Sequence, residues 1–195
     1  MESVDKRSRI QHAAMQLFQE QGVEATSVNE IVKRANVAKG TFYVYYKDKK
    51  ELISQILTKQ HGCLLNDLLN RSYERSAKQK SSWKAAFVDE MITCYMKDPV
   101  LLRTIQKNIT SILDTEEHRM LVFQQVERLQ EFLDLVRRDH EDARTALNRF
   151  MLVLEIIGIV CYNAIYFQHP DNLDALLPEL KHTMRNMIES EECNL

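Results

Sequence analysis

Glycine and proline are scarce in this chain, and their scarcity limits the folds that it can adopt. The 195 residues include only 4 Gly and 3 Pro, whereas β-rich folds need these residues at their many turns. Apolar residues recur instead at helical spacing, as Ile10, Ala14, Leu17 and Phe18 do near the N-terminus. The sequence therefore predicts an all-α protein.

The apolar periodicity also predicts where the later helices lie. Asp48 is placed to cap a helix that runs to about Tyr73, and the segment from Ser76 to Ser82 is predicted to be a flexible loop. Further helices are expected at 82–96, from Pro99, at 115–138 as one continuous helix, at 141–168, and after Pro170.

Composition argues against a membrane or secreted protein. The most apolar stretch, from Phe150 to Phe167, is interrupted by Glu155 and Asn163, and the N-terminus leads into an amphipathic helix. The four cysteines are widely spaced, at positions 63, 94, 161 and 193, with no metal-ligand spacing. We interpret them as reduced thiols of a cytoplasmic protein that carries no metal or other cofactor.

Charge is distributed unevenly along the chain. Residues 1–50 hold nine Lys and Arg against six Asp and Glu, a balance of +3, and the remainder has a balance of −5 within an overall charge of −2. A mildly basic head on an acidic body is typical of a protein that binds nucleic acid through its N-terminus.

Two short helices with a tight turn between them are predicted at residues 27–46. Ser27 and Glu30 have the spacing of a capping box, and Asn36 can adopt the left-handed conformation that ends a helix. Phe42 and Tyr46, four residues apart, should share the buried face of the second helix. The pattern indicates a helix-turn-helix, whose second helix enters the major groove of DNA.

The opposite face of that second helix carries Gly40, Thr41 and Val44, with Tyr43 on its flank and Lys39 in the first turn. Small and apolar residues are unusual on a solvated face but suit one pressed against DNA. Glycine permits close approach, Thr and Val can contact thymine methyl groups, and lysine can donate to guanine or phosphate.

The segment from Thr26 to Leu52 closely resembles the DNA-binding signature of the tetracycline-repressor (TetR) family. The resemblance runs from about Lys6 to Leu57, and its most specific part is Lys-Gly-Thr-Phe-Tyr at 39–43 followed by Lys49, Glu51 and Leu52. It implies about nine helices, with a three-helix DNA-binding domain at 1–52 and a helical dimerisation and ligand-binding domain at 53–195.

The resemblance also implies which residues contact the operator. They are Ser27, Asn29, Lys39, Gly40, Thr41, Tyr43, Val44, Tyr45 and Lys49. Ala38 replaces a frequent Ser, Val44 and Tyr45 replace common His residues, and Asn36 replaces the usual Gly of the turn. The binding mode is therefore carried over, but the operator sequence is not. For Tyr45, a packing role is an alternative to a phosphate contact.

A homodimer is expected through residues 145–190. The helix at 145–167 is apolar on nearly all sides and needs more burial than one chain of this size provides. The family implies that the two long terminal helices form a four-helix bundle with the partner, and that each protomer reads one half of a pseudo-palindromic operator.

A hydrophobic or aromatic effector is the remaining expectation from the family. The candidate residues for its site are Met91, Tyr95, Phe123, Phe150, Glu155 and Tyr166. Each has an alternative role: the apolar residues can be ordinary core, and Glu155 can form a salt bridge or face water. His61 and the other histidines are interpreted as scattered surface side chains.

The sequence thus predicts a transcriptional regulator, a repressor that an effector releases from DNA. An enzyme would need paired carboxylates and histidines on facing helices, or a glycine-rich phosphate loop, and neither pattern occurs. An alternative is the same DNA-binding head with a protein partner or no effector, in an architectural or activating role. A cavity in the C-terminal domain would favour the ligand.

Overall fold

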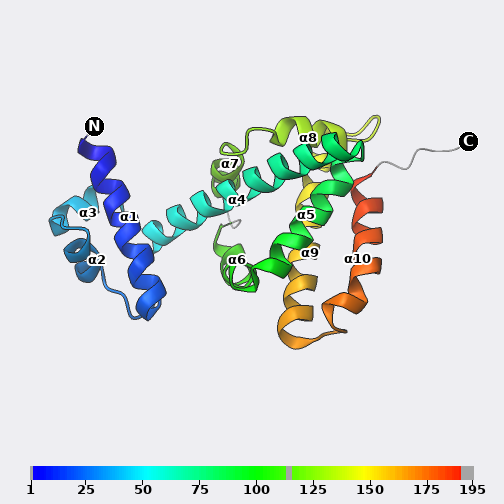
Figure 1. The fold of residues 1–195 in the computed structure, drawn as a ribbon. Coiled ribbons are helices and arrows are strands. Elements are labelled where there is room, and N and C mark those ends of the chain that lie inside the picture. The colour runs from blue at the N-terminus through cyan, green and yellow to red at the C-terminus, as the bar shows by residue number, and fades with distance from the viewer. Residues whose placement is uncertain (1, 113–115, 190–195) are drawn as a thin grey trace, which may run out of the picture. The chain divides into compact units, whose positions relative to one another are not determined.

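The computed structural model describes residues 2–112 and 116–189, and the side chains of residues 6–106 and 120–189. Within these ranges the chain forms ten α-helices and no strand, so the prediction of an all-α fold is confirmed (Figure 1). The helices are α1 Glu2–Gln21, α2 Val28–Arg34, α3 Lys39–Tyr45, α4 Lys49–Gln79, α5 Trp83–Lys97, α6 Pro99–Ile112, α7 Glu116–Phe123, α8 Leu129–Val136, α9 Ala143–Phe167 and α10 Leu173–Ile188.

The chain divides into two compact units, an N-terminal unit of Met1–Lys59 and a C-terminal unit of Gln60–Leu195. The N-terminal unit packs α1, α2, α3 and the start of α4 around one small core. Ile10, Ile31, Phe42 and Leu52 contribute one side chain from each helix, and all four are fully buried. This core fills the space between the four helices with the side chains that the periodicity had marked as apolar faces.

Helix α4 continues six residues beyond the predicted end at Tyr73 and takes in part of the predicted loop. The hydroxyls of Ser72 and Ser76 donate to the carbonyls of Leu69 and Tyr73, at 2.9 and 2.8 Å, so both serines are satisfied inside the helix. The helix ends where Lys80 adopts the left-handed conformation, with φ of 51°.

The segment predicted as one helix at 115–138 is two helices, α7 and α8, which accounts for ten helices where about nine were expected. The turn between them is held against α4, because the Glu127 backbone amide donates to Asn66 Oδ1 at 3.0 Å. Gly62 lets this turn approach closely, since a Cβ there would lie 2.9 Å from the Gln125 side chain. The side chain of Val126, in this turn, is only 6% exposed and anchors the turn to the core.

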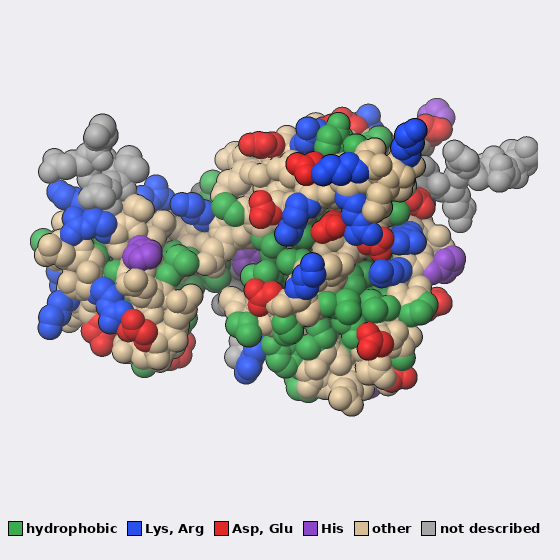
Figure 2. All heavy atoms as spheres, viewed as in Figure 1, with side chains coloured by type: hydrophobic (Ala, Val, Ile, Leu, Met, Phe, Trp, Pro, Cys, Tyr) green, Lys and Arg blue, Asp and Glu red, His purple; other side chains and the backbone are tan. Residues whose placement is uncertain are grey.

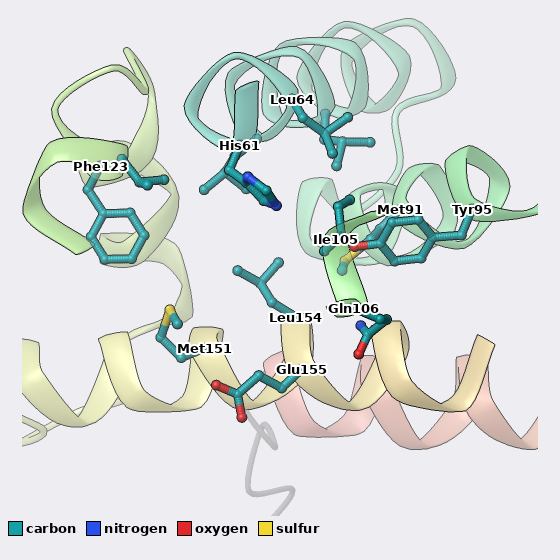
Figure 3. Close-up of a pocket in the computed structure, with 13 residues that line it drawn as sticks. His61, Leu64, Met91, Tyr95, Ile105, Gln106, Phe123, Met151, Leu154 and Glu155 are labelled. Atoms are coloured by element: carbon teal, nitrogen blue, oxygen red, sulfur yellow. The ribbon is translucent and has the colours of Figure 1, made fainter. Parts of the chain in front are cut away.

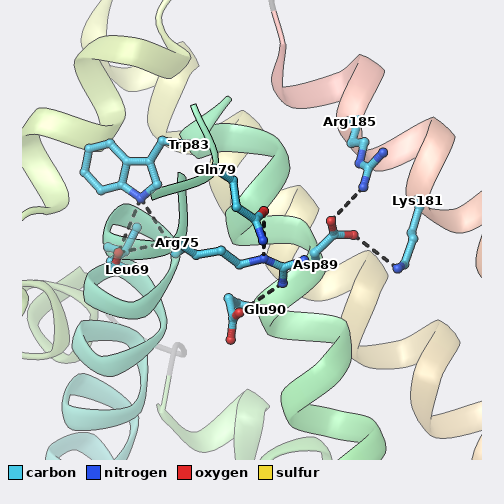
Figure 4. A network of polar contacts seen from close by, with 9 residues as sticks. Leu69, Arg75, Gln79, Trp83, Asp89, Glu90, Lys181 and Arg185 are labelled. Atoms are coloured by element: carbon cyan, nitrogen blue, oxygen red, sulfur yellow. Dashed lines mark hydrogen bonds and ion pairs between the residues drawn. The ribbon is translucent and has the colours of Figure 1, made fainter. Parts of the chain in front are cut away.

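A polar network joins α5 to α4 on one side and to α10 on the other (Figure 4). On one side Asp89 accepts from Arg185 at 2.7 Å and lies 3.2 Å from the ammonium of Lys181. On the other side Glu90 pairs with Arg75 at 3.1 Å. The adjacent carboxylates of α5 therefore fix helices that are far apart in the sequence.

Helix α9 is the central helix of the C-terminal unit and contacts α5, α6, α8 and α10. Asp142 caps its first turn by accepting from the Thr145 amide at 2.7 Å. Within the described residues it is the one helix long and apolar enough to cross a membrane, by length and composition alone. Its contacts with four helices are those of a core helix.

Candidate DNA interface and effector pocket

The turn between α2 and α3 has a defined hydrogen-bonded geometry. Asn36 takes the left-handed conformation, with φ of 51°, as predicted. The amides of Asn36 and Val37 donate to the carbonyls of Lys33 and Val32, at 3.2 and 3.0 Å, in the pattern of a Schellman motif. Arg9 of α1 then donates to the carbonyl of Asn36 at 2.8 Å. The turn is therefore fixed both locally and by α1.

The start of α2 is fixed by the predicted capping box. The Ser27 hydroxyl accepts from the Glu30 amide at 3.3 Å, and the Glu30 carboxylate accepts from the Ser27 amide at 2.8 Å. The donating Ser27 amide holds the pKa of the Glu30 carboxyl below its usual range. Ser27 and Asn29 are both exposed, so they remain accessible candidates for the DNA contacts proposed from the sequence.

Helix α3 separates a buried face from an open one. Phe42 is fully buried and Tyr46, which follows the helix, is 1% exposed. On the other side Tyr43 is 53% and Val44 77% exposed. A Cβ atom at Gly40 would meet nothing within 4 Å. We call Lys39, Gly40, Thr41, Tyr43 and Val44 the outer face of α3; all are exposed except Thr41, which is half-buried.

Two residues proposed as operator contacts have other partners in the structure. Lys49 is half-buried, and its ammonium donates to the carbonyls of Val23 and Thr26, both at 2.9 Å. It therefore ties the start of α4 to the loop before α2. Tyr45 is half-buried and packs against the core beside Tyr46, with ring centroids 6.4 Å apart. This contact favours the packing role that the sequence left open.

Lys and Arg side chains lie around the surface of the N-terminal unit (Figure 2). Lys39 on α3, Lys47 just before α4 and Lys50 in its first turn are exposed. A helix that enters a DNA groove needs small and apolar side chains facing the bases and lysines beside them to contact the phosphates that flank the groove. This arrangement of side chains is present here.

The C-terminal unit contains an inner cavity of about 80 Å³ that is partly open to solvent. Figure 3 shows His61 and Leu64 of α4, Phe123 of α7 and Leu154 of α9 around it. Its lining comprises His61, Leu64, Leu65, Leu68, Met91, Tyr95, Ile105, Gln106, Val122, Phe123, Met151, Leu154 and Glu155. The lining is mostly apolar with few polar groups, as is typical of a small-molecule site.

Four of the six effector candidates line this cavity: Met91, Tyr95, Phe123 and Glu155. Burial raises the pKa of the Tyr95 hydroxyl, which therefore stays neutral. Glu155 is exposed on α9 at the edge of the cavity.

The structure places the other two candidates elsewhere. Phe150 is fully buried in an aromatic cluster, with ring centroids 5.6 Å from both Phe87 and Phe132. Tyr166 donates its hydroxyl to the Pro99 carbonyl at 2.7 Å and lies under the Arg103 guanidinium. Phe150 fills the core, and Tyr166 joins α9 to α6.

Two polar lining residues were missed by sequence reasoning. His61, interpreted as a surface histidine, is half-buried and points into the cavity (Figure 3). Gln106 reaches the cavity because Gly158 of α9 leaves room for its amide, with which a Cβ at that position would clash. The unusual glycine within an apolar helix was the available signal for a close approach. The sequence held no comparable signal for His61.

An outer groove adjoins the inner cavity and shares Phe123, Met151 and Glu155 with it. It lies along α8 and the first turns of α9. The rest of its lining is Met120, Gln130, Leu133, Asp134, Arg137, Ala143, Arg144, Ala146, Leu147, Asn148 and Leu152. In contrast to the inner cavity, it includes two guanidinium groups.

The described residues include no cluster of three or more His, Cys, Asp and Glu side chains that could hold a metal ion. Cys63 is an exposed free thiol, Cys94 a half-buried one and Cys161 a buried one, whereas Cys193 lies outside the described residues. Burial raises the pKa of the Cys161 thiol to about 12.

The fixed turn, the buried Phe42 and the open outer face of α3 define the N-terminal unit as a helix-turn-helix. Residues 10–56 match the family described as bacterial regulatory proteins, tetR family. This N-terminal domain is therefore similar to the DNA-binding domain of that family.

Curated relatives agree with this assignment. The chain is 44% identical over 55 residues to the HTH-type transcriptional regulator AcrR of Shigella flexneri, a match that covers 28% of this chain and 26% of that protein. It is 33% identical over 101 residues to the uncharacterized regulator YvdT of Bacillus subtilis, which covers 50% of each. The matched segments thus span half or less of these relatives.

Solved structures resemble the whole chain in fold. The FadR repressor of Thermus thermophilus in complex with lauroyl-CoA gives a TM-score of 0.58 at 18% identity, covering 97% of this chain and 98% of that one. A putative tetR-family regulator of Vibrio parahaemolyticus gives 0.54 at 22% identity, covering 95% and 99%. FadR of Bacillus subtilis in complex with stearoyl-CoA gives 0.52 at 18% identity, covering 93% and 99%.

Proposed function

We propose that this protein is a transcriptional repressor that binds a pseudo-palindromic operator in double-stranded DNA as a homodimer and is released by a hydrophobic small molecule. The observation that carries the DNA-binding part is the outer face of α3. It presents a glycine, a threonine, a half-exposed tyrosine and an exposed valine from a helix whose other side is anchored in the core. The family match and the lysines at its border support the same assignment.

The DNA contact can be tested with Tyr43→Ala. Because Tyr43 is exposed, removing its ring should lower affinity for DNA about tenfold or more with little effect on folding. The measurement is a gel-shift titration on a duplex selected by the wild-type protein from a random library. Glu24→Ala, at an exposed position before α2, is the control and should bind as the wild type does.

Unchanged affinity of Tyr43→Ala, with a normal thermal unfolding curve, would contradict a DNA contact at this position.

Homodimerisation through α9 and α10 is the second part of the proposal. Although α9 lies in the core, Leu152 and Ile159 remain 47% and 45% exposed on one side of it. Large aliphatic side chains aligned on one helix face need a partner surface. In a two-fold dimer the same face of a second copy supplies it, and each copy presents one α3 to a half-site.

Ile159→Lys tests this interface. A lysine at the centre of an apolar contact should convert the dimer into a monomer at micromolar concentration, because the buried charge has no partner. Light scattering measures the mass, and Met96→Lys, which makes the same change at an exposed position on α5, is the control. A monomeric wild type, or a dimeric Ile159→Lys, would contradict the proposed interface.

The inner cavity supports a small-molecule effector over a protein partner. A C-terminal unit with no internal space would have favoured a partner, whereas this cavity is apolar and bordered by His61, Gln106 and Glu155. The two FadR structures of similar fold were solved with acyl-CoA molecules, a precedent for ligands with an apolar acyl chain in this architecture. An effector releases DNA if it binds the conformer that does not fit the operator more tightly, typically by about 1–3 kcal/mol of coupling.

A further inference from the structure

The inner cavity and the outer groove differ in the charged side chains that line them. A ligand that occupies both would therefore place its apolar end and its charged end in different spaces. Among the described residues that line the inner cavity, none is Lys or Arg, and the one carboxylate is Glu155 at the edge. The outer groove has Arg137 and Arg144 in its lining. Both guanidiniums therefore lie on the same side of the shared boundary.

The shared boundary is formed by Phe123, Met151 and Glu155. Figure 3 shows Phe123 and Met151 next to each other at the edge of the cavity, on α7 and α9. Both side chains are apolar and half-buried. These two side chains give the boundary between the two spaces an apolar surface that a chain of methylene groups can contact.

An anionic group is disfavoured in the inner cavity. It would lose its hydration among leucine, methionine and phenylalanine side chains, with no Lys or Arg among the described lining residues and the Glu155 carboxylate at the edge. A hydrocarbon tail is favoured there for the same reason, because burial removes apolar surface from water.

The outer groove is lined by two carboxylates, Asp134 and Glu155, as well as by the two guanidinium groups. The Asp134 carboxylate makes its hydrogen bond and its ion pair with neighbouring side chains. Asp134 already accepts a hydrogen bond from Gln130 at 3.1 Å, and its carboxylate lies 3.8 Å from the Arg137 guanidinium. Such an exposed pair is held by only about 0–1 kcal/mol, so Arg137 can exchange it for a ligand. Arg144 is exposed in the first turn of α9 and faces the same groove.

We propose that the effector is an amphipathic molecule whose apolar tail fills the inner cavity and whose anionic head, a carboxylate or a phosphate, binds Arg137 and Arg144 in the outer groove. The inference rests on the proposed effector response and specifies its ligand class. Arginine is suited to both heads because its guanidinium donates two parallel hydrogen bonds to paired oxygens. Met151 and Phe123 surround the tail where it leaves the inner cavity.

The test uses four probes with one tail and different heads: dodecanoate, dodecyl phosphate, dodecanol and dodecylammonium, each below its micelle concentration. Calorimetric titration into the full-length protein should show the two anions binding at least tenfold tighter than the alcohol, with the ammonium weakest. The anion that binds more tightly identifies the head as carboxylate or phosphate.

The variant Arg137→Gln/Arg144→Gln should weaken both anions about tenfold and leave dodecanol unchanged. Arg138→Gln, an exposed arginine next to the groove but outside its lining, is the matched control and should bind all probes as the wild type does. Leu154→Trp, which fills the inner cavity, should weaken every probe that has the tail.

Equal binding of the anions and the alcohol, or an unchanged double variant, would overturn the anionic head site. Unchanged binding to Leu154→Trp would overturn the placement of the tail, and so would the failure of all four probes to bind. These failures differ from failure of the proposed function. If dodecanol alone releases the selected duplex, the effector response stands and this inference falls, whereas a wild type that selects no duplex refutes the DNA-binding function itself.

Discussion

The two units of this protein use the same building element, an amphipathic helix, in opposite ways. The N-terminal unit fills its interior with Ile10, Ile31, Phe42 and Leu52 and leaves its candidate binding residues outside on α3. The C-terminal unit leaves empty space between α4, α5, α6, α7 and α9, and four of its candidate binding residues line that space. One unit is suited to a rigid external surface and the other to a ligand that completes its packing.

The difference has a consequence for how each unit responds to change. A filled core has few alternative packings, so it holds α3 in one orientation. A unit with a cavity loses contacts around that cavity, and a ligand that fills it regains them. The C-terminal unit is therefore the part of the molecule whose conformations a small molecule can favour or disfavour.

A matched pair of truncations on α4 gives the largest expected effect. Leu52 is fully buried in the N-terminal core, whereas Leu64 is half-buried at the inner cavity. Leu52→Ala should lower the free energy of unfolding by about 2–5 kcal/mol, and Leu64→Ala by less than about 2 kcal/mol, because its neighbours already border empty space. Urea denaturation followed by circular dichroism measures both. Equal losses would contradict the contrast between a filled and an open interior.

A smaller effect on stability is expected from the ion pair between Glu141, just before α9, and Arg149 in α9. Glu141 pairs with Arg149 and accepts from the Arg138 amide, and these contacts, chiefly the Arg149 guanidinium, hold the Glu141 pKa below its usual 4.5. A carboxyl group whose pKa is lowered by folding stabilises the folded protein at pH values above its unfolded-state pKa. This stabilisation is lost as the pH falls through the folded-state pKa.

Glu141→Gln should therefore lose less stability than the wild type when the pH is lowered from about 5 to about 3. Thermal unfolding at a series of pH values measures this difference. Parallel acid limbs for the two proteins would show that this carboxylate does not contribute to acid unfolding of the C-terminal unit.

The N-terminal unit was predictable because its signals are local. The capping box of Ser27 and Glu30 and the left-handed Asn36 act within a few residues, so the sequence states them directly. The contacts of Lys49 could not be predicted from local signals. Its two carbonyl partners, on Val23 and Thr26, lie more than twenty residues away, and only the folded loop reveals them.

The C-terminal unit was predictable only in outline, because α9 is apolar on most of its circumference. The sequence of such a helix does not show which of its faces borders a cavity. It therefore predicts Phe150 as a pocket residue, whereas the adjacent Met151 and nearby Leu154 line the cavity and Phe150 is buried in the core. The division of 115–138 into two helices likewise depends on a contact with another helix, between the Glu127 amide and Asn66. Long-range packing decides these features.

Gly40→Ala tests most directly the central claim that the outer face of α3 meets DNA. The added methyl group would meet nothing within 4 Å, and alanine favours a helix over glycine by about 0.5–1 kcal/mol. The account predicts an unfolding free energy that is unchanged or slightly higher, together with an affinity for the selected duplex that falls about tenfold or more, since the methyl group occupies space that the DNA needs. Unchanged affinity in a normally folded variant would show that this face does not approach DNA closely and would contradict the account.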